Sequence, residues 1–130
     1  LIAKGKADYV VSLELLESLR KIEFLSDEGT MIVNDFKIDP VPVQQGVLEY
    51  PQDIKDYLNA NVKNLFIAET ESVLKEIGSQ KALNIVMLGI LSNYLEFSEN
   101  EWLESVKVCV KEKFVDMNIK AFLAGRNLQK

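Results

Sequence analysis

Two short β-branched runs on either side of a helix-length stretch constrain this fold more than any other sequence feature. The runs are residues 8–13 (DYVVSL) and 30–35 (TMIVND), of which YVVSL and MIV are almost continuously apolar, and residues 15–25 (LLESLRKIEFL) carry an apolar stripe at helical spacing. A turn cluster at 26–29 puts Gly29 where that helix would end. A strand, a helix and a second strand are the parts of a βαβ crossover, so we predict a parallel sheet with helices packed on it.

The segment 36–52 departs from this pattern. Pro40, Pro42 and Pro51 disfavour a helix and suit extended chain, so we predict an irregular excursion with one or two short strands. After it, Asp53 is a candidate helix cap. The further elements that we expect are a helix over 53–61, a strand over 63–69, and helices over 70–78, 81–97, about 99–114 and from about 116.

Three local signals refine the second half of the chain. Gly78 is placed to close the helix over 70–78, and Ser98 with Glu101 forms a capping-box pattern. In the last helix we expect Arg126 to face outward. We find no repeat or interdomain linker, so we predict one domain over residues 1–130. Its class would be a three-layer α/β/α fold with a mostly parallel or mixed sheet.

Composition excludes several functions. The net charge of -5 argues against a nucleic-acid partner and an anionic membrane surface. The longest apolar stretch is interrupted by Asn93 and Glu96, which excludes a membrane span, and no signal peptide opens the sequence, so we expect a cytoplasmic protein. The chain has no His and a single cysteine, Cys109, which we expect to pack as a small apolar residue. We therefore predict no metal site and no iron–sulfur cluster held by this chain alone.

Polar residues beside apolar segments are the candidate site residues. Asn34 ends a predicted strand, Asn84 lies in the apolar helix over 81–97, and Asn118 lies near the start of the last helix. A buried Asn must find hydrogen-bond partners, so each either bridges local backbone or lines a ligand or subunit contact. Gly89, in the middle of the same apolar helix, would let a strand of this chain or a partner subunit approach closely.

Four blocks of the sequence also match, in order, the motifs of a known family. The first block contains Ala7, Asp8, Glu14, Glu17, Arg20, Gly29, Thr30 and Asn34. The second contains Ile38, Pro40, Val41, Val43, Gly46, Tyr50 and Pro51. The third contains Gly78, Asn84, Val86, Met87, Leu88 and Gly89, and the fourth Asn118, Ala121, Phe122 and Gly125. Together they resemble the gamma-type catalytic domain of the 2-oxoacid:ferredoxin oxidoreductases, most closely the beta subunits of the indolepyruvate branch.

The resemblance implies a subunit of a complex that oxidatively decarboxylates aryl 2-oxoacids, such as indolepyruvate, to aryl-acetyl-CoA and passes electrons to ferredoxin. Thiamine diphosphate and the iron–sulfur clusters would belong to a larger alpha subunit, with coenzyme A also used by the complex. This chain would bind no cofactor itself and would be inactive alone. Its catalytic residues are unknown, and Asn34, Asn84, Asn118 and Gly89 are the candidates for positions near the substrate or the partner subunit.

One expected motif is absent. Members of the family begin with a Gly-rich strand–loop–helix, and no such loop occurs in this sequence, so we expect the N-terminal portion of the domain to be missing. Two other interpretations stay open. One alternative is a non-catalytic α/β module that holds partner chains together. The other, with weaker support, is a nucleotide-binding domain that lacks the usual phosphate loop.

Overall fold

The protein is described by a computed structural model over residues 1–129. The chain divides into two compact units, which we call unit 1 (Leu1–Ala68) and unit 2 (from Glu69 onward). Unit 1 contains the sheet, and the elements of unit 2 between residues 69 and 129 are helical. The prediction of one domain stays a prediction.

Unit 1 is built on a parallel sheet with the strand order β1-β2-β3. Its strands are β1 (Ala7–Ser12), β2 (Leu25–Asn34) and β3 (Asn64–Ala68), and both neighbouring pairs are parallel. The βαβ prediction is therefore confirmed, as is the α/β class. The strands follow one another in chain order because each crossover returns to the next position of the sheet.

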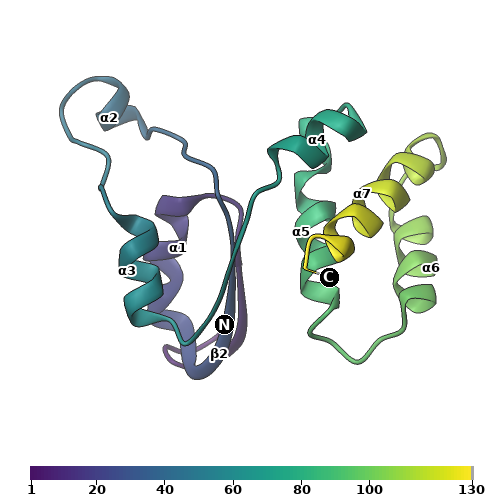
Figure 1. Cartoon of the computed structure of the whole chain (residues 1–130), viewed down its shortest axis with the longest axis horizontal. Coiled ribbons are helices and arrows are strands. Elements are labelled where there is room, and N and C mark those ends of the chain that lie inside the picture. The colour runs from purple at the N-terminus through teal and green to yellow at the C-terminus, as the bar shows by residue number, and fades with distance from the viewer. Residues whose placement is uncertain (130) are drawn as a thin grey trace. The chain divides into compact units, whose positions relative to one another are not determined.

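Two helices cover one face of this sheet. They are α1 (Leu15–Lys21), continued by a 3-10 turn at Ile22–Phe24, and α3 (Ile54–Asn61), and Figure 1 shows them next to each other within unit 1. The core beneath them is formed by Leu15, Met31, Val33, Tyr50, Ile54, Leu58 and Val62. The sheet and these helices make two layers, and the third layer of the expected α/β/α arrangement stays a prediction.

The predicted turn at 26–29 is wrong, because these residues extend β2. The register of β1 against β2 shifts between Ala7 and Tyr9, so residues 26–29 of β2 lie opposite the single residue Asp8 of β1. A side chain on Gly29 would lie within 3 Å of the Ala7 carbonyl oxygen. Gly29 thus permits a β-bulge inside the strand and does not end a helix.

The segment 36–52 also differs from its prediction. It contains no strand, and one helical turn, α2 (Val41–Gln44), forms directly after Pro40. Pro42 lies in the first turn of the helix, where a backbone N–H would have no intrahelical acceptor, so the N–H that proline lacks costs no hydrogen bond. The prolines therefore start a short helix here. Asp53 precedes α3 as expected but makes no side-chain capping bond, since its backbone is left-handed with φ 60°.

Unit 2 is formed by α4 (Glu71–Ile77), α5 (Leu83–Ser92), α6 (Glu99–Cys109) and α7 (Val115–Asn127). Gly78 closes α4 and the Ser98–Glu101 capping box begins α6, as the sequence predicts. Helix α5 ends at Ser92, five residues before the predicted end at 97, and α6 ends at Cys109. Cys109 is exposed, so its predicted packing is wrong: α6 turns Val106 inward and leaves the last helical turn in solvent.

Candidate functional site

The candidate site lies where the loops leave the carboxyl ends of β1 and β2 in unit 1. Glu14 follows β1 by two residues, and Asn34 is the last residue of β2. Because β1 and β2 are parallel, both loops emerge at the same edge of the sheet. This edge is where parallel α/β sheets bind their ligands.

Glu14 is the central group of this edge. Its carboxylate is buried, with the residue 6% exposed, and accepts three hydrogen bonds. The Tyr50 hydroxyl donates to Oε1 at 2.6 Å, the Ile38 backbone N–H donates to the same oxygen at 3.1 Å, and the Glu17 N–H donates to Oε2 at 2.9 Å. The last bond caps α1. Three donors offset the cost of burying the charge and attach the segment 36–52 to the start of α1.

Tyr50 is buried beside this carboxylate. Burial raises the pKa of the Tyr50 phenol well above its ordinary value, and the hydrogen bond to Glu14 and the negative charge of Glu14 raise that pKa further. The phenol therefore stays protonated, and its hydroxyl continues to donate a hydrogen bond to the Glu14 carboxylate. The Lys37 ammonium lies over the Tyr50 ring, 4.5 Å from its centroid, and pairs with Asp39 at 3.2 Å.

Asn34 connects the two loops at this edge. Its side chain is buried, and Nδ2 donates to the Leu13 carbonyl oxygen at 3.2 Å. The next residue, Asp35, pairs with Lys55 of α3 at 2.8 Å. The Asp35 N–H also donates to the Ala68 carbonyl oxygen at 2.8 Å, at the end of β3. The ends of all three strands are thus bonded to one another.

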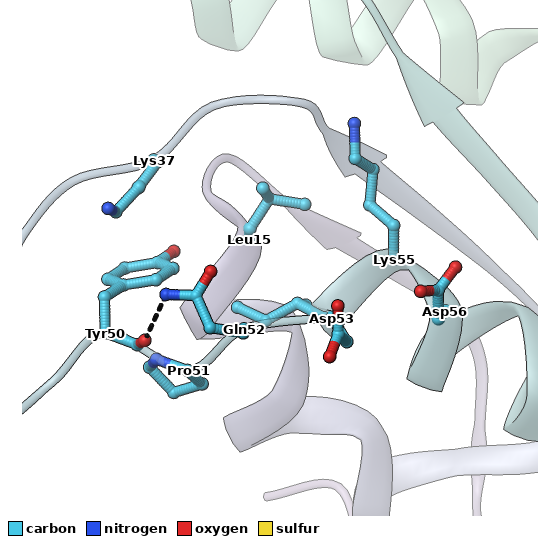
Figure 2. A pocket seen from close by; sticks show the side chains of 9 residues that line it. Leu15, Lys37, Tyr50, Pro51, Gln52, Asp53, Lys55 and Asp56 are labelled. Carbon is cyan, nitrogen blue, oxygen red and sulfur yellow. Dashed lines mark hydrogen bonds between the residues drawn. The ribbon is translucent and has the colours of Figure 1, made fainter.

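A hollow of about 290 Å³ opens beside Tyr50 at the N-terminus of α3, as Figure 2 shows. It is lined by Leu15, Lys37, Tyr50, Pro51, Gln52, Asp53, Ile54, Lys55 and Asp56. The Gln52 side chain donates to the Tyr50 carbonyl oxygen at 3.0 Å, and this bond orients Gln52 in the wall of the hollow. Two lysines and two aspartates give the lining mixed charge. The arrangement can bind and orient a small polar group, and it contains no paired nucleophile and base.

A second group of predicted residues lies in unit 2, where α5 packs on α7. A side chain on Gly89 would overlap the Phe122 carbonyl oxygen, and one on Gly125 would overlap the Val86 carbonyl oxygen. The close approach predicted at Gly89 is therefore confirmed. The approaching element is helix α7 of the same chain, so the expectation of a strand or a partner subunit at this point is wrong.

Arg126 joins three helices of unit 2. Its guanidinium donates to the Ser92 hydroxyl at 2.8 Å and lies 3.2 Å from a carboxylate oxygen of Glu99. The Asn93 side chain donates to the Arg126 carbonyl oxygen at 2.9 Å. The Arg126 side chain is mostly buried, so its predicted outward position is wrong. It lies on the side of α7 that faces α5 and α6, where the Glu99 carboxylate compensates its charge and the Ser92 hydroxyl accepts a hydrogen bond from it.

The structure places the three predicted asparagines differently. Asn34 is buried at the sheet edge. Asn118 is buried too, but Nδ2 donates to the Phe114 carbonyl oxygen at 2.8 Å, one turn back along the chain. Asn84 is exposed on the face of α5 away from its buried residues, so its expected burial is wrong. Asn84 and Gly89 share α5, and Asn118 lies on the adjacent α7, whereas Asn34 belongs to unit 1.

Sequence reasoning missed Glu14 and Tyr50 as site residues. Both occur in the motif blocks, Glu14 in the first and Tyr50 in the second, and the structure joins these blocks by a direct hydrogen bond. Gly89 and Gly125, from the third and fourth blocks, lie at the crossing of α5 and α7. Within residues 1–129, no three His, Cys, Asp or Glu side chains gather as metal ligands, and no helix has the length and apolar character to cross a bilayer.

Comparison with known proteins gives a matching family profile and several similar curated proteins. The family profile described as pyruvate ferredoxin/flavodoxin oxidoreductase matches residues 1–128. The chain is 32% identical to indolepyruvate oxidoreductase subunit IorB of Thermococcus kodakarensis over 130 residues, which cover 96% of this chain and 64% of that protein.

Two further relatives carry the same name. The subunit from Archaeoglobus fulgidus is 32% identical over 131 residues, covering 98% of this chain and 65% of the relative. The subunit from Pyrococcus horikoshii is 33% identical over 130 residues, covering 96% and 64%. The chain thus spans a little under two thirds of the length of these relatives. From the profile match and these identities, the chain belongs to the pyruvate ferredoxin/flavodoxin oxidoreductase family.

Proposed function

We propose that this chain is part of a subunit of an indolepyruvate, or aryl 2-oxoacid, ferredoxin oxidoreductase. The reaction would be oxidative decarboxylation of an aryl pyruvate to an aryl-acetyl-CoA, with electrons delivered to ferredoxin. The observation that carries the proposal is the similarity to three subunits named IorB over 96–98% of this chain. We also propose that the complex is cytoplasmic.

In this proposal a larger alpha subunit holds thiamine diphosphate and the iron–sulfur clusters, and ferredoxin and coenzyme A meet the complex there. An iron–sulfur cluster does not fit the residues of this chain, because the sequence has one cysteine, Cys109, and a cluster needs four thiolate or comparable ligands. We therefore assign no redox step to this chain. Its role would be to bind the alpha subunit and shape the surroundings of the reaction.

Asn34 is the best-supported of the candidate site residues. It is the last residue of β2, at the carboxyl edge of the sheet, and its amide donates to the Leu13 carbonyl oxygen in the β1–α1 loop, although Asn34 does not line the hollow beside Tyr50. The packing of Gly89 and the local bond of Asn118 account for those residues within unit 2. We keep Asn84 as a candidate for partner contact because it is exposed.

The proposal is tested on the complex itself. The subunit that carries this chain is co-purified with the alpha subunit, and indolepyruvate-dependent ferredoxin reduction is measured with and without coenzyme A. Activity that requires the subunit supports the proposal. A purified alpha subunit with full activity and no bound copy of this chain would contradict it.

The alternative of a pure interaction module is favoured by one observation, the exposed apolar side chains of the segment 36–52. Asn84→Ala separates the two functions, since an exposed helix position tolerates Ala without loss of folding. A fall in kcat with assembly intact indicates a site role, whereas lost assembly at unchanged specific activity of the residual complex indicates a scaffold.

A further inference from the structure

The loop between β2 and α3 is closed at its neck by a single carboxylate oxygen. The Ile38 N–H and the Tyr50 hydroxyl, one near each end of the loop, donate to Oε1 of Glu14 at 3.1 Å and 2.6 Å. Figure 1 shows α2 at the far end of this loop, away from α1 and α3 of unit 1. Compact surface loops whose two ends meet in this way are able to move as one piece, and they often have a function.

The far part of the loop is ordered by its own hydrogen bonds. The Val47 N–H and the Leu48 N–H both donate to the Pro42 carbonyl oxygen, at 2.9 Å and 3.1 Å. The Gly46 N–H donates to the Val43 carbonyl oxygen at 3.0 Å, and Gly46 supplies the positive φ of 72° that this turn needs. These bonds join the loop to itself, so they are kept when the loop moves away from the helices.

Few apolar contacts fasten the loop to the core of unit 1. Tyr50 is part of that core and Val43 packs against it. Val41, Val47 and Leu48, in contrast, are at least 60% exposed. A segment with few buried contacts opens at a lower free energy than the strands of a core. The two bonds to the buried carboxylate are therefore a large part of what keeps the loop closed.

The loop lies between two fixed points. At its start, the Phe36 carbonyl oxygen accepts the Leu15 N–H at 2.9 Å. At its end, Asp53 has a left-handed backbone with φ 60°, which is a strained conformation for a residue other than Gly. The Asp53 carbonyl oxygen accepts the Tyr57 N–H at 2.9 Å, so the first turn of α3 is held independently of the loop. The strained backbone at Asp53 is thus placed to act as a pivot for residues 37–52.

Glu14 can release the loop without leaving its charge unsolvated. Its other oxygen, Oε2, accepts the Glu17 N–H at 2.9 Å and caps α1. That bond does not involve the loop, so the carboxylate keeps a protein partner when the loop leaves. Water then reaches Oε1 in place of the two lost donors, and the cost of breaking their bonds is partly offset.

Opening of the loop would remove one wall of the hollow beside Tyr50. The loop contributes one side of the lining, and Leu15 with the first turn of α3 contributes the other. Figure 2 shows Lys37 and Tyr50 on the side of the loop and Lys55 and Asp56 on the side of α3. The hollow is therefore complete only while the loop is closed.

We propose that residues 37–52 form a strap that opens as one body about Asp53 while the sheet stays folded, and that Glu14 is the latch that holds the strap closed. With the strap closed, Glu14 joins its two ends to the start of α1. With the strap open, Glu14 still caps α1, and the hollow is lost. This device belongs to unit 1 itself and does not depend on the proposed function.

Native-state amide hydrogen exchange, measured on the subunit that carries this chain, tests the strap. The Ile38 N–H reports opening because its acceptor is Glu14, and the amides of residues 31–33 in the central strand β2 report unfolding of the sheet. We expect a protection factor for Ile38 at least ~100-fold lower than for residues 31–33. Exchange at Ile38 should also change little at low urea concentrations, because opening of the strap exposes little surface.

A pair of matched variants tests the latch. Tyr50→Phe removes one of the two bonds from the strap to Glu14, and we expect it to raise the exchange rate of Ile38 at least ~5-fold. Tyr57→Phe, at an exposed position on α3, is the control and should leave that rate within ~2-fold of the rate in the unsubstituted protein.

The result that supports the strap and its latch is fast exchange at Ile38 that depends little on urea and rises in Tyr50→Phe alone. If Ile38 matches residues 31–33 in rate and urea dependence, the loop opens only when the sheet unfolds and the proposal is wrong. This comparison needs no substituted protein. Fast exchange that Tyr50→Phe leaves unchanged, or that both variants raise equally, also overturns the proposal, because Glu14 and Tyr50 would then not control the opening.

Discussion

At the scale of single residues, the buried carboxylate of Glu14 accounts for most of the order at the carboxyl edge of the sheet. It caps α1 through the Glu17 N–H and holds both ends of the segment 36–52 through Ile38 and Tyr50. A carboxylate in this environment depends on its donors, since each lost hydrogen bond leaves part of the charge unsolvated.

Removing the Tyr50 hydroxyl tests this dependence. Tyr50→Phe takes one donor from Glu14 at 2.6 Å, and we expect the free energy of unfolding to fall by about 1–3 kcal/mol. Urea unfolding followed by circular dichroism measures the change. Tyr57→Phe, at an exposed position on α3, is the control and should change stability by less than ~0.5 kcal/mol. Equal stability of both variants would show that Glu14 does not need the phenol.

The raised pKa of Tyr50 predicts a specific pH dependence. The unfolded phenol ionises near its ordinary pKa of 10.0, whereas the folded phenol stays protonated above that pH because of its burial and of Glu14. The stabilisation is complete below pH 10 and is lost as the pH rises above it. The stability difference between the unsubstituted protein and Tyr50→Phe should therefore shrink as the pH rises above about 10, for example between about pH 10 and pH 11. A difference that stays constant over this range would contradict the assignment.

At the scale of elements, sequence patterns predicted what short-range physics determines. The β-branched runs became β1 and the second half of β2, the capping box began α6, and Gly78 closed α4. The errors occur where a distant contact overrides the local pattern. Gly29 meets the backbone of β1, whose position is not visible from the residues around Gly29. In the same way Glu14 and Tyr50 are 36 residues apart, and only the fold brings them together.

Helix α5 shows how a tertiary contact explains an unfavourable residue. Gly costs about 1 kcal/mol relative to Ala in a helix, yet Gly89 lies mid-helix because α7 passes directly over it. A glycine in the middle of an apolar helix indicated a close approach but could not identify the neighbouring element, because that depends on how α7 folds back. The structure identifies the neighbour as α7, where Gly125 in turn lies against the backbone of Val86.

Substituting Gly89 should reverse the usual effect of helix propensity. Gly89→Ala adds a methyl group that overlaps the Phe122 carbonyl oxygen, and we expect overpacking to lower stability by about 1–3 kcal/mol. Thermal unfolding measures the change. Asn84→Ala, on the exposed face of the same helix, serves as the control and should leave Tm unchanged or slightly raise it. A Gly89→Ala protein that is more stable than the parent would mean that α5 and α7 do not pack this closely.

At the scale of the whole molecule, the family resemblance seen in the sequence and the contacts seen in the structure agree. The first two motif blocks meet at Glu14 and Tyr50 in unit 1, and the last two meet at Gly89 and Gly125 in unit 2. Such residues explain how each unit is held together, and they do not by themselves provide a reaction. In the proposed complex the chemistry would depend on a partner subunit, which no pattern within this sequence could describe.

The most direct test of the account is reconstitution of the complex. Indolepyruvate-dependent reduction of ferredoxin is measured for the alpha subunit alone, for the subunit that carries this chain alone, and for the two together. We predict activity only in the mixture, with binding of the two subunits in the same samples. Full activity of the alpha subunit alone, or a mixture that binds indolepyruvate but never reduces ferredoxin, would contradict the account.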